Sequence, residues 1–225
     1  MKLPTLTTVQ PQNEKLLVEL ANMAGDSYLE ELWVRELLSA MPENSEGSDR
    51  ERFLSRALVL NEAMAAAPSQ SVHCTGDGYG LTIAYQRSEL GTTSWAQLMK
   101  DASANLIASV FSDEEIDAYE QQQRRMEGVT VLDWVEREEA PGDFLHITLT
   151  AVDAEHRGSG TFRKLLEPVL TYADEAQLPI FLETYSDDLT ALYEYFGFKV
   201  VHEFKSPEVS ITQRCLRRDP QPQEA

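Results

Sequence analysis

Basic residues are scarce in this chain of 225 residues. Lysine and arginine number 19 against 38 aspartates and glutamates, which gives a formal net charge of −19. A protein that binds nucleic acid needs a basic face to neutralise phosphates, so we expect no nucleic-acid partner. The same acidity would steer a cationic substrate towards the protein, although solubility alone also accounts for it.

Cysteine and long apolar runs are equally scarce. Cys74 and Cys215 lie far apart and form no ligand motif, so we expect neither a disulfide framework nor a metal site. No apolar run approaches the roughly 20 residues that a membrane span needs, and the first residues lack the apolar stretch of a secretory signal. We therefore expect a cytoplasmic protein without a membrane partner.

Apolar spacing predicts many helices before residue 130. We expect a strand over residues 2–9 and a helix that begins at Asn13 and ends at Gly25. A hairpin is expected where two β-rich runs flank a glycine-containing turn. Further helices are expected over residues 27–41, 50–66, 94–111 and 113–126, and the hairpin strands over 72–75 and 81–85.

The last third of the chain has the clearest pattern. We expect strands over 144–152, 180–184, 198–204 and 208–216, and helices that begin at Thr161 and over 188–196. This order predicts an α/β (α+β) fold with a mixed central sheet and helices on both faces. We expect one domain over residues 1–217 and a flexible tail over 218–225.

A glycine-rich turn joins the strand 144–152 to the helix that follows. Its sequence is Arg157-Gly158-Ser159-Gly160-Thr161, and the window from His156 to Lys164 holds three basic residues and no acid. Helix starts leave N–H groups without partners, and glycines let backbone approach a phosphate. The turn therefore predicts an anion site, although a tight turn that binds nothing has the same form. A Walker loop or dinucleotide fold would need residues that are missing here.

Two blocks of this sequence resemble the GCN5-related N-acetyltransferases. Arg157-Gly158-Ser159-Gly160-Thr161-Phe162 is similar to that family's acetyl-CoA loop, and Leu192-Tyr193-Glu194-Tyr195-Phe196-Gly197-Phe198 is similar to its second block. The chain looks most like the puromycin N-acetyltransferase branch. The resemblance is firm over 144–217 and faint over 13–130, the half that we expect to lie beside the substrate. It implies a largely antiparallel sheet and acetyl transfer from acetyl-CoA to a primary amine of a small molecule.

The resemblance also implies roles for individual residues. The backbone of Thr150, Ala151 and Val152 would pair with the pantetheine arm of acetyl-CoA, and Tyr193 would stand near the thioester sulfur. The N–H groups of the loop, Arg157, Gly158, Ser159, Gly160, Thr161 and Phe162, would hold the pyrophosphate. Phe162 and Leu189 depart from the family pattern, and we expect the Phe162 ring to point away from the pyrophosphate.

The chemistry of such a transfer needs a base and an acid. An alkylammonium has a pKa near 10.4, so its neutral form is rare at pH 7. We expect His146 or Glu183 to remove the proton, and Tyr193 to protonate the leaving sulfur. The alternative roles are structural: a hydrogen-bonded strand residue for His146 or Glu183, and a core residue for Tyr193. The alternative function is a catalytically silent module that binds or senses acyl-CoA. A homodimer is compatible with either function.

Overall fold

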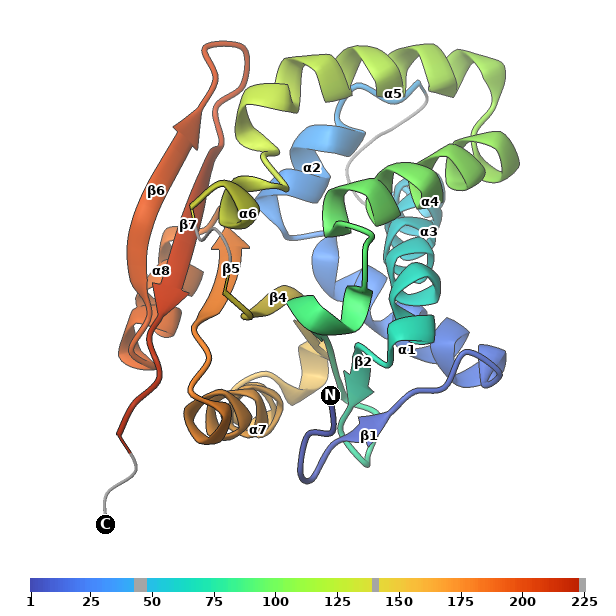
Figure 1. The fold of residues 1–225 in the computed structure, drawn as a ribbon. Helices are drawn as coiled ribbons and strands as arrows, with labels where there is room; N and C mark the ends of the chain where they lie inside the picture. Colours follow the sequence, from blue (N-terminus) through green and yellow to red (C-terminus); the bar gives the residue numbers. More distant parts are fainter. Residues whose placement is uncertain (43–47, 139–141, 223–225) are drawn as a thin grey trace.

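The computed structural model describes residues 1–42, 48–138 and 142–222, and Figure 1 shows its helices arranged around one sheet. The helices are α1 (Glu14–Tyr28), α2 (Leu32–Leu38), α3 (Asp49–Ala66), α4 (Trp95–Val110), α5 (Asp113–Met126), α6 (Trp134–Glu138), α7 (Thr161–Ala176) and α8 (Asp187–Tyr195). The strands are β1 (Thr7–Thr8), β2 (Val72–Cys74), β3 (Gly80–Gln86), β4 (Leu145–Val152), β5 (Ile180–Thr184), β6 (Lys199–Lys205) and β7 (Thr212–Arg218).

The sheet has seven strands in the order β1-β2-β3-β4-β5-β7-β6. The pairing of β4 with β5 is parallel, and the other pairings in the described sheet are antiparallel. This arrangement confirms the expected α/β (α+β) class with a mixed, largely antiparallel sheet. It also places the only described parallel pair, β4 and β5, in the interior of the sheet.

Apolar side chains form a core on each face of the sheet. Ile147 and Leu182 pack in the core that includes the apolar stripe of α7 and Tyr193 of α8. Leu149 and Phe181 pack in the core with apolar residues of α1 and α3. Figure 1 shows the same division, with α1, α3 and α4 grouped away from α7. Helices on both faces are therefore confirmed.

Helix α1 continues beyond Gly25, where we expected it to end. A Cβ at this position would lie 2.5 Å from the Cα of Arg56, so the missing side chain lets α1 and α3 pack closely. The hydroxyl of Ser55 donates a hydrogen bond of 2.7 Å to the Gly25 carbonyl across the same contact. The glycine therefore serves helix packing, and the extra turn carries Ser27 and Tyr28 towards β4.

The first and last strands of the chain differ from the expected boundaries. The strand expected over 2–9 is reduced to β1, and the last strand begins at Thr212 and continues through Arg218. Arg218 is buried, and its guanidinium donates hydrogen bonds of 2.7 and 2.9 Å to the Asp174 carboxylate of α7. The backbone N–H of Gln221 donates to the same carboxylate at 2.8 Å, so the chain is anchored as far as Gln221 within the segment that we expected to be a tail. Residues 223–225 lie outside the described residues.

Candidate active site

The two central strands diverge at the bulged residue Thr148. Strand β4 pairs with β5 only from Leu145 to Ile147, although β4 itself continues to Val152. On the other side, Ile83 pairs with Leu149 and Ala84 with Ile147, so Thr148 has no partner of its own in β3. A bulge of this kind inserts one extra residue, so the side chains that follow it point to the opposite face of the sheet from the one that regular alternation would give them. The strand beyond Thr148 therefore offers backbone groups to something other than β5.

The last turn of α1 occupies those backbone groups. The N–H of Thr150 donates to the Tyr28 hydroxyl at 3.3 Å. The Ser27 hydroxyl donates to the Val152 carbonyl at 2.7 Å. These are the backbone positions at which the sequence predicted pairing with pantetheine. The structure therefore shows that this edge of β4 forms hydrogen bonds outside the sheet.

The glycine loop meets the same end of β4. Gly158 and Gly160 have φ angles of +75° and +88°, a region that other residues adopt with strain, and a Cβ on either would meet nothing within 4 Å. Gly160 is the N-cap of α7 and no side chain caps this helix start. The first N–H groups of α7 are therefore free of side-chain acceptors, which is the property that an anion site requires.

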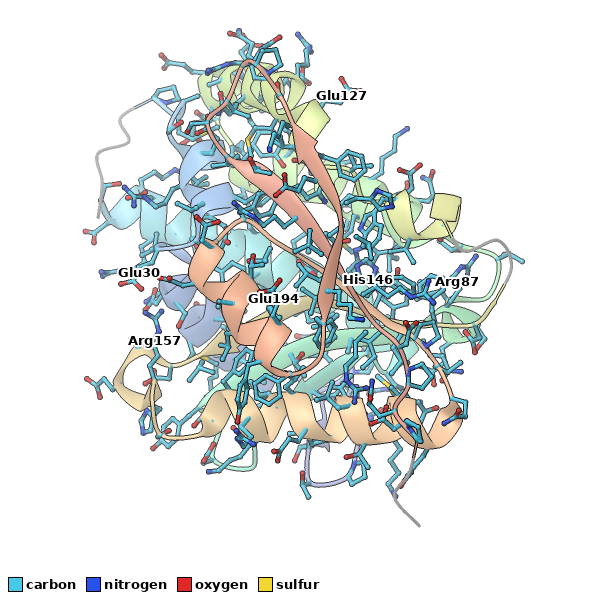
Figure 2. All side chains as sticks on the ribbon, turned by 90° about the vertical axis from the view of Figure 1, so that its left-hand side faces the viewer. Glu30, Arg87, Glu127, His146, Arg157 and Glu194 are labelled. Carbon is cyan, nitrogen blue, oxygen red and sulfur yellow. The ribbon has the colours of Figure 1, made fainter. Side chains whose placement is uncertain are left out.

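Arg157 links the glycine loop to the segment between α1 and α2. Its guanidinium forms an ion pair with Glu30 and donates to the Ser27 carbonyl at 3.4 Å. Figure 2 shows the two charged side chains next to each other at the surface. The side chains are 45% exposed for Arg157 and 73% for Glu30, so the pair is open to water and to competing anions.

Phe162 packs against α8. Its ring centroid lies 5.6 Å from that of Tyr193 and 6.0 Å from that of Phe196, and Leu189 joins the same apolar cluster. Both residues that depart from the family pattern are thus part of the contact between α7 and α8. This gives the bulky ring a packing role at the position where the family's loop has a small residue.

Tyr193 reaches β4 from α8. It is 6% exposed, and its hydroxyl is hydrogen-bonded to the side chain of Thr150. Burial raises the pKa of Tyr193 to about 12, and the bond to Thr150 offsets only part of that effect. The side chain is therefore a neutral phenol, able to donate a hydrogen bond, throughout the physiological pH range.

His146 and Glu183 form a buried network with two aromatic residues. The Nδ1 atom of His146 is hydrogen-bonded to the Tyr85 hydroxyl at 2.9 Å, and its Nε2 lies 2.9 Å from both carboxylate oxygens of Glu183. The indole N–H of Trp134 donates to the same carboxylate. His146 is 2% exposed, as its interior position in Figure 2 illustrates. Both ring nitrogens are thus engaged inside the core.

Glu62, Glu31 and Tyr28 lie at this site, although no motif in the sequence indicated them. The Thr148 hydroxyl donates to Glu62 of α3 at 2.7 Å, and burial raises the pKa of Glu62 to about 7. Burial also raises the pKa of Glu31, the N-cap of α2. Tyr28 lies among them: its pKa is raised well above the ordinary value by burial first, and then by Glu62, Glu31 and Tyr193. Glu62 and Glu31 therefore add carboxylates to the site.

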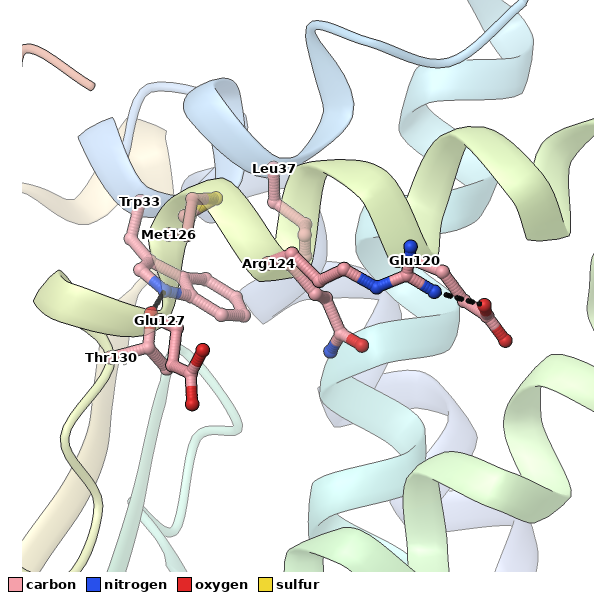
Figure 3. Close-up of a pocket in the computed structure, with 8 residues that line it drawn as sticks. Trp33, Leu37, Glu120, Arg124, Met126, Glu127 and Thr130 are labelled. Atoms are coloured by element: carbon pink, nitrogen blue, oxygen red, sulfur yellow. Dashed lines mark hydrogen bonds and ion pairs between the residues drawn. The ribbon is translucent and has the colours of Figure 1, made fainter. Parts of the chain in front are cut away.

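Two surface hollows are lined by residues at the start of α2, Trp33 in one and Leu32 in the other. One, of about 490 Å³, lies between α2 and the end of α5, and Trp33, Arg124 and Thr130 line it. Figure 3 shows the Trp33 indole N–H bonded to the Thr130 hydroxyl there. The other, of about 460 Å³, is lined by Leu32 and Tyr185 among others. Glu31 accepts the backbone N–H of Trp33 at 2.6 Å, which fixes its carboxylate at the start of α2.

Within residues 1–42, 48–138 and 142–222 the structure shows neither a group of metal-ligating side chains nor a helix that could cross a membrane. No cluster of histidine, cysteine and acidic side chains in these ranges has the arrangement of a metal site. No helix in them combines the length and the apolarity of a membrane span. His73 lies in β2, His156 in a short turn after β4 and His202 in β6.

Sequence comparison finds relatives that match over short segments only. No family model matches the chain. An uncharacterized N-acetyltransferase of Schizosaccharomyces pombe is 36% identical over 53 residues, which are 24% of this chain and 22% of that protein. Increased recombination centers protein 11 of Saccharomyces cerevisiae is 37% identical over 71 residues, 30% of this chain and 46% of that protein. The matches thus span less than half the length of these relatives.

Solved structures resemble the whole chain. A histone acetyltransferase HPA2 and related acetyltransferase from Corynebacterium glutamicum matches with a TM-score of 0.54 and 16% identity, over 99% of this chain and 100% of that one. Arylalkylamine N-acetyltransferase 2 from Aedes aegypti matches with a TM-score of 0.55 and 11% identity, over 96% of this chain and 98% of that one. An N-acetyltransferase from Staphylococcus aureus matches with a TM-score of 0.55 and 18% identity, over 94% of this chain and 98% of that one. The chain has the GCN5-related N-acetyltransferase fold; the puromycin branch stays a prediction.

The pKa of Glu62 predicts how stability depends on pH. A native pKa of about 7, against an ordinary value of 4.5, means that the native state keeps a proton that the unfolded state has already lost between these pH values. The free energy of unfolding should therefore fall as the pH rises through this window. Glu62→Gln cannot ionise, so we expect it to be more stable than the wild type by roughly 1–3 kcal/mol at pH 8.5, and by little at pH 4.5.

Urea unfolding of both proteins at the two pH values measures this difference. Glu194→Gln removes an exposed carboxylate of α8 and is the matched control, expected to change stability by less than about 0.5 kcal/mol. An equal stability change at pH 4.5 and 8.5 would show that Glu62 titrates normally in the native protein.

Proposed function

We propose that this chain is an acyl-CoA-dependent N-acyltransferase that transfers acetyl from acetyl-CoA to a primary amine of a small molecule. The observation that carries the proposal is the edge of β4 beyond Thr148. Two of its backbone groups, the N–H of Thr150 and the C=O of Val152, turn away from the sheet beside the uncapped start of α7. A linear amide ligand with a diphosphate at one end matches that pair of features.

Acetyl-CoA fits the residues that are present. The pantetheine amides would replace the hydroxyls of Ser27 and Tyr28 on β4. The N–H groups from Arg157 to Phe162 would receive the diphosphate, helped by the dipole of α7. Arg157 would exchange its surface ion pair with Glu30 for a phosphate. On β4 each pantetheine contact would replace a bond that the protein already makes, so the exchange leaves no group of this edge unpaired.

Transfer would proceed by direct attack of the amine on the thioester carbon. The C–N bond forms, the C–S bond breaks, and the sulfur leaves as a thiolate. Tyr193, kept neutral by burial, would donate a hydrogen bond and then a proton to that sulfur. The network of His146 and Glu183 is the base proposed from the sequence, and Glu183 is its more exposed member, with a side chain 14% exposed.

An amine acceptor agrees with the charge of the site. Glu31, Glu62 and Glu183 are carboxylates around the divergence of β4 and β5, and the net charge of the chain is −19. An ammonium group would be attracted to such a site. One protein with the same fold is named an arylalkylamine N-acetyltransferase, which supports an amine in general terms. We also propose a cytoplasmic location, with acetyl-CoA and a small amine as partners.

A silent acyl-CoA-binding module is the second candidate. The bonds of Ser27 and Tyr28 to β4, and the ion pair of Glu30 with Arg157, favour it because they occupy the cofactor's place. Such a module would bind acetyl-CoA and transfer nothing. Turnover therefore separates the two candidates, whereas binding does not.

We expect CoA release when the protein is mixed with acetyl-CoA and a panel of small amines. A thiol reagent measures the CoA, and thermal unfolding with acetyl-CoA alone measures binding. Stabilisation together with amine-dependent release supports the transferase. Stabilisation without release from any amine supports the silent module, and no stabilisation contradicts both.

Removal of the Tyr193 hydroxyl should slow turnover without weakening cofactor binding. Tyr193→Phe keeps the ring contacts with Phe162 and Phe198, but it leaves the departing thiolate without a donor. We expect kcat to fall at least roughly tenfold while the Kd of CoA changes less than about twofold. An unchanged kcat would show that Tyr193 only packs in the core.

Removal of the Glu30 charge should tighten cofactor binding. Because Glu30 competes with the diphosphate for Arg157, we expect Glu30→Gln to lower the Kd of CoA by about threefold to tenfold. Calorimetry measures the Kd, and Glu167→Gln is the control, since Glu167 pairs with Arg163 at a comparably exposed position of α7. If Glu30→Gln binds CoA no more tightly than the control does, Arg157 takes no part in holding the diphosphate.

A further inference from the structure

Glu62 of α3 is placed at the point where the sheet opens. Its carboxylate accepts a hydrogen bond of 2.7 Å from Thr148, the bulged residue after which β4 leaves β5. Tyr28, which interacts electrostatically with Glu62, holds the Thr150 N–H two residues further along β4. The carboxylate therefore lies close to the backbone edge that the acyl donor would occupy.

In the part of the chain that the structure describes, no lysine or arginine pairs with Glu62, and His146 is the one basic side chain that lowers its pKa. Among the described residues, those that face it are Thr148 and His146 from β4, Glu183 from β5 and Tyr28 from α1. None of them is lysine or arginine, and no described group of α4, which packs on α3, acts on the carboxylate. A half-buried carboxylate without a lysine or arginine partner is costly, so proteins keep one mainly where it serves a purpose.

We propose that Glu62 accepts the proton that the ammonium group of the acceptor loses before attack, which makes a primary alkylamine the substrate class. The inference rests on the proposed function. It adds a catalytic residue that has no counterpart among the motifs of the sequence. The ammonium would supply a full positive charge to a carboxylate that has no lysine or arginine partner among the described residues.

The proton and electron balance of the step is complete. The ammonium gives one proton to Glu62, which later releases it to solvent, and the neutral nitrogen uses its lone pair to form the C–N bond. The C–S bond breaks and its electron pair stays on sulfur. Tyr193 gives a proton to the sulfur and regains one from the nitrogen, so that the products are the amide, CoA with a free thiol and one released proton.

The geometry favours Glu62 over His146 for this step. Both nitrogens of His146 are already bonded, to Tyr85 and Glu183, so the ring would have to break a core hydrogen bond to take a proton. Glu62 has one hydrogen bond from a hydroxyl donor and can accept more. With a pKa of about 7 it is also partly ionised, and a base of about this strength is effective near neutral pH.

Rates with two probe amines test the inference. In 2-phenylethylamine the nitrogen is an alkylammonium at pH 7, whereas in aniline it is neutral and needs no base before attack. With Glu62→Gln we expect kcat/KM for 2-phenylethylamine to fall by roughly 30-fold or more, and for aniline by less than about threefold. Glu194→Gln, with an exposed carboxylate beside Tyr193, should leave both rates unchanged.

The pH profile gives a second readout that a structural role would not change. The wild-type kcat/KM should level off above the pKa of Glu62, about 7, whereas Glu62→Gln should keep rising towards the pKa of the free amine. Thr148→Val removes a hydrogen bond that lowers the pKa of Glu62, so its profile should move up by about half a unit to one unit.

The outcomes separate this inference from the proposed function. If the wild type releases CoA with neither probe nor any amine of the panel, the proposed function fails and the inference fails with it. If the wild type acetylates 2-phenylethylamine and Glu62→Gln does so with the same rate and the same pH profile, the proposed function stands and Glu62 is not the base. An equal loss with both probes would likewise overturn the inference.

Discussion

One bulged residue in β4 determines the geometry of this site. Because Thr148 has no paired residue in β3, Ile147 faces the α7 core and Leu149, two residues later, faces the α1 and α3 core, although two residues of a regular strand at this spacing would share a face. The same shift turns the N–H of Thr150 and the C=O of Val152 towards α1. Beyond Ile147 strand β4 is not paired with β5, which leaves this backbone edge available for a ligand.

Desolvation gives the acid and the base of the proposed reaction different protonation states. Burial raises the pKa of Tyr193 to about 12 and that of Glu62 to about 7. The phenol therefore keeps its proton for the sulfur, while the carboxylate is ionised often enough to take one from the amine. Two groups with separated pKa values at one opening are typical of acid–base catalysis.

The sequence predicted those parts of the fold that follow from local pattern. The apolar stripe of α7 and the β-rich run of β4 indicated their elements within a few residues, and positive φ angles at Gly158 and Gly160 agree with the expected loop. Gly25 was interpreted wrongly as a helix end, because its role is a contact with α3 that only the packed structure reveals. Glu62 was missed for the same reason, since nothing in an amphipathic helix shows which carboxylate will be buried.

A crystal structure with CoA bound tests the central claim most directly. We predict that the pantetheine amides replace the hydroxyls of Ser27 and Tyr28 on the Thr150 N–H and the Val152 C=O, with the diphosphate at the start of α7. A structure in which CoA binds elsewhere, while both hydroxyls keep their bonds to β4, would contradict it.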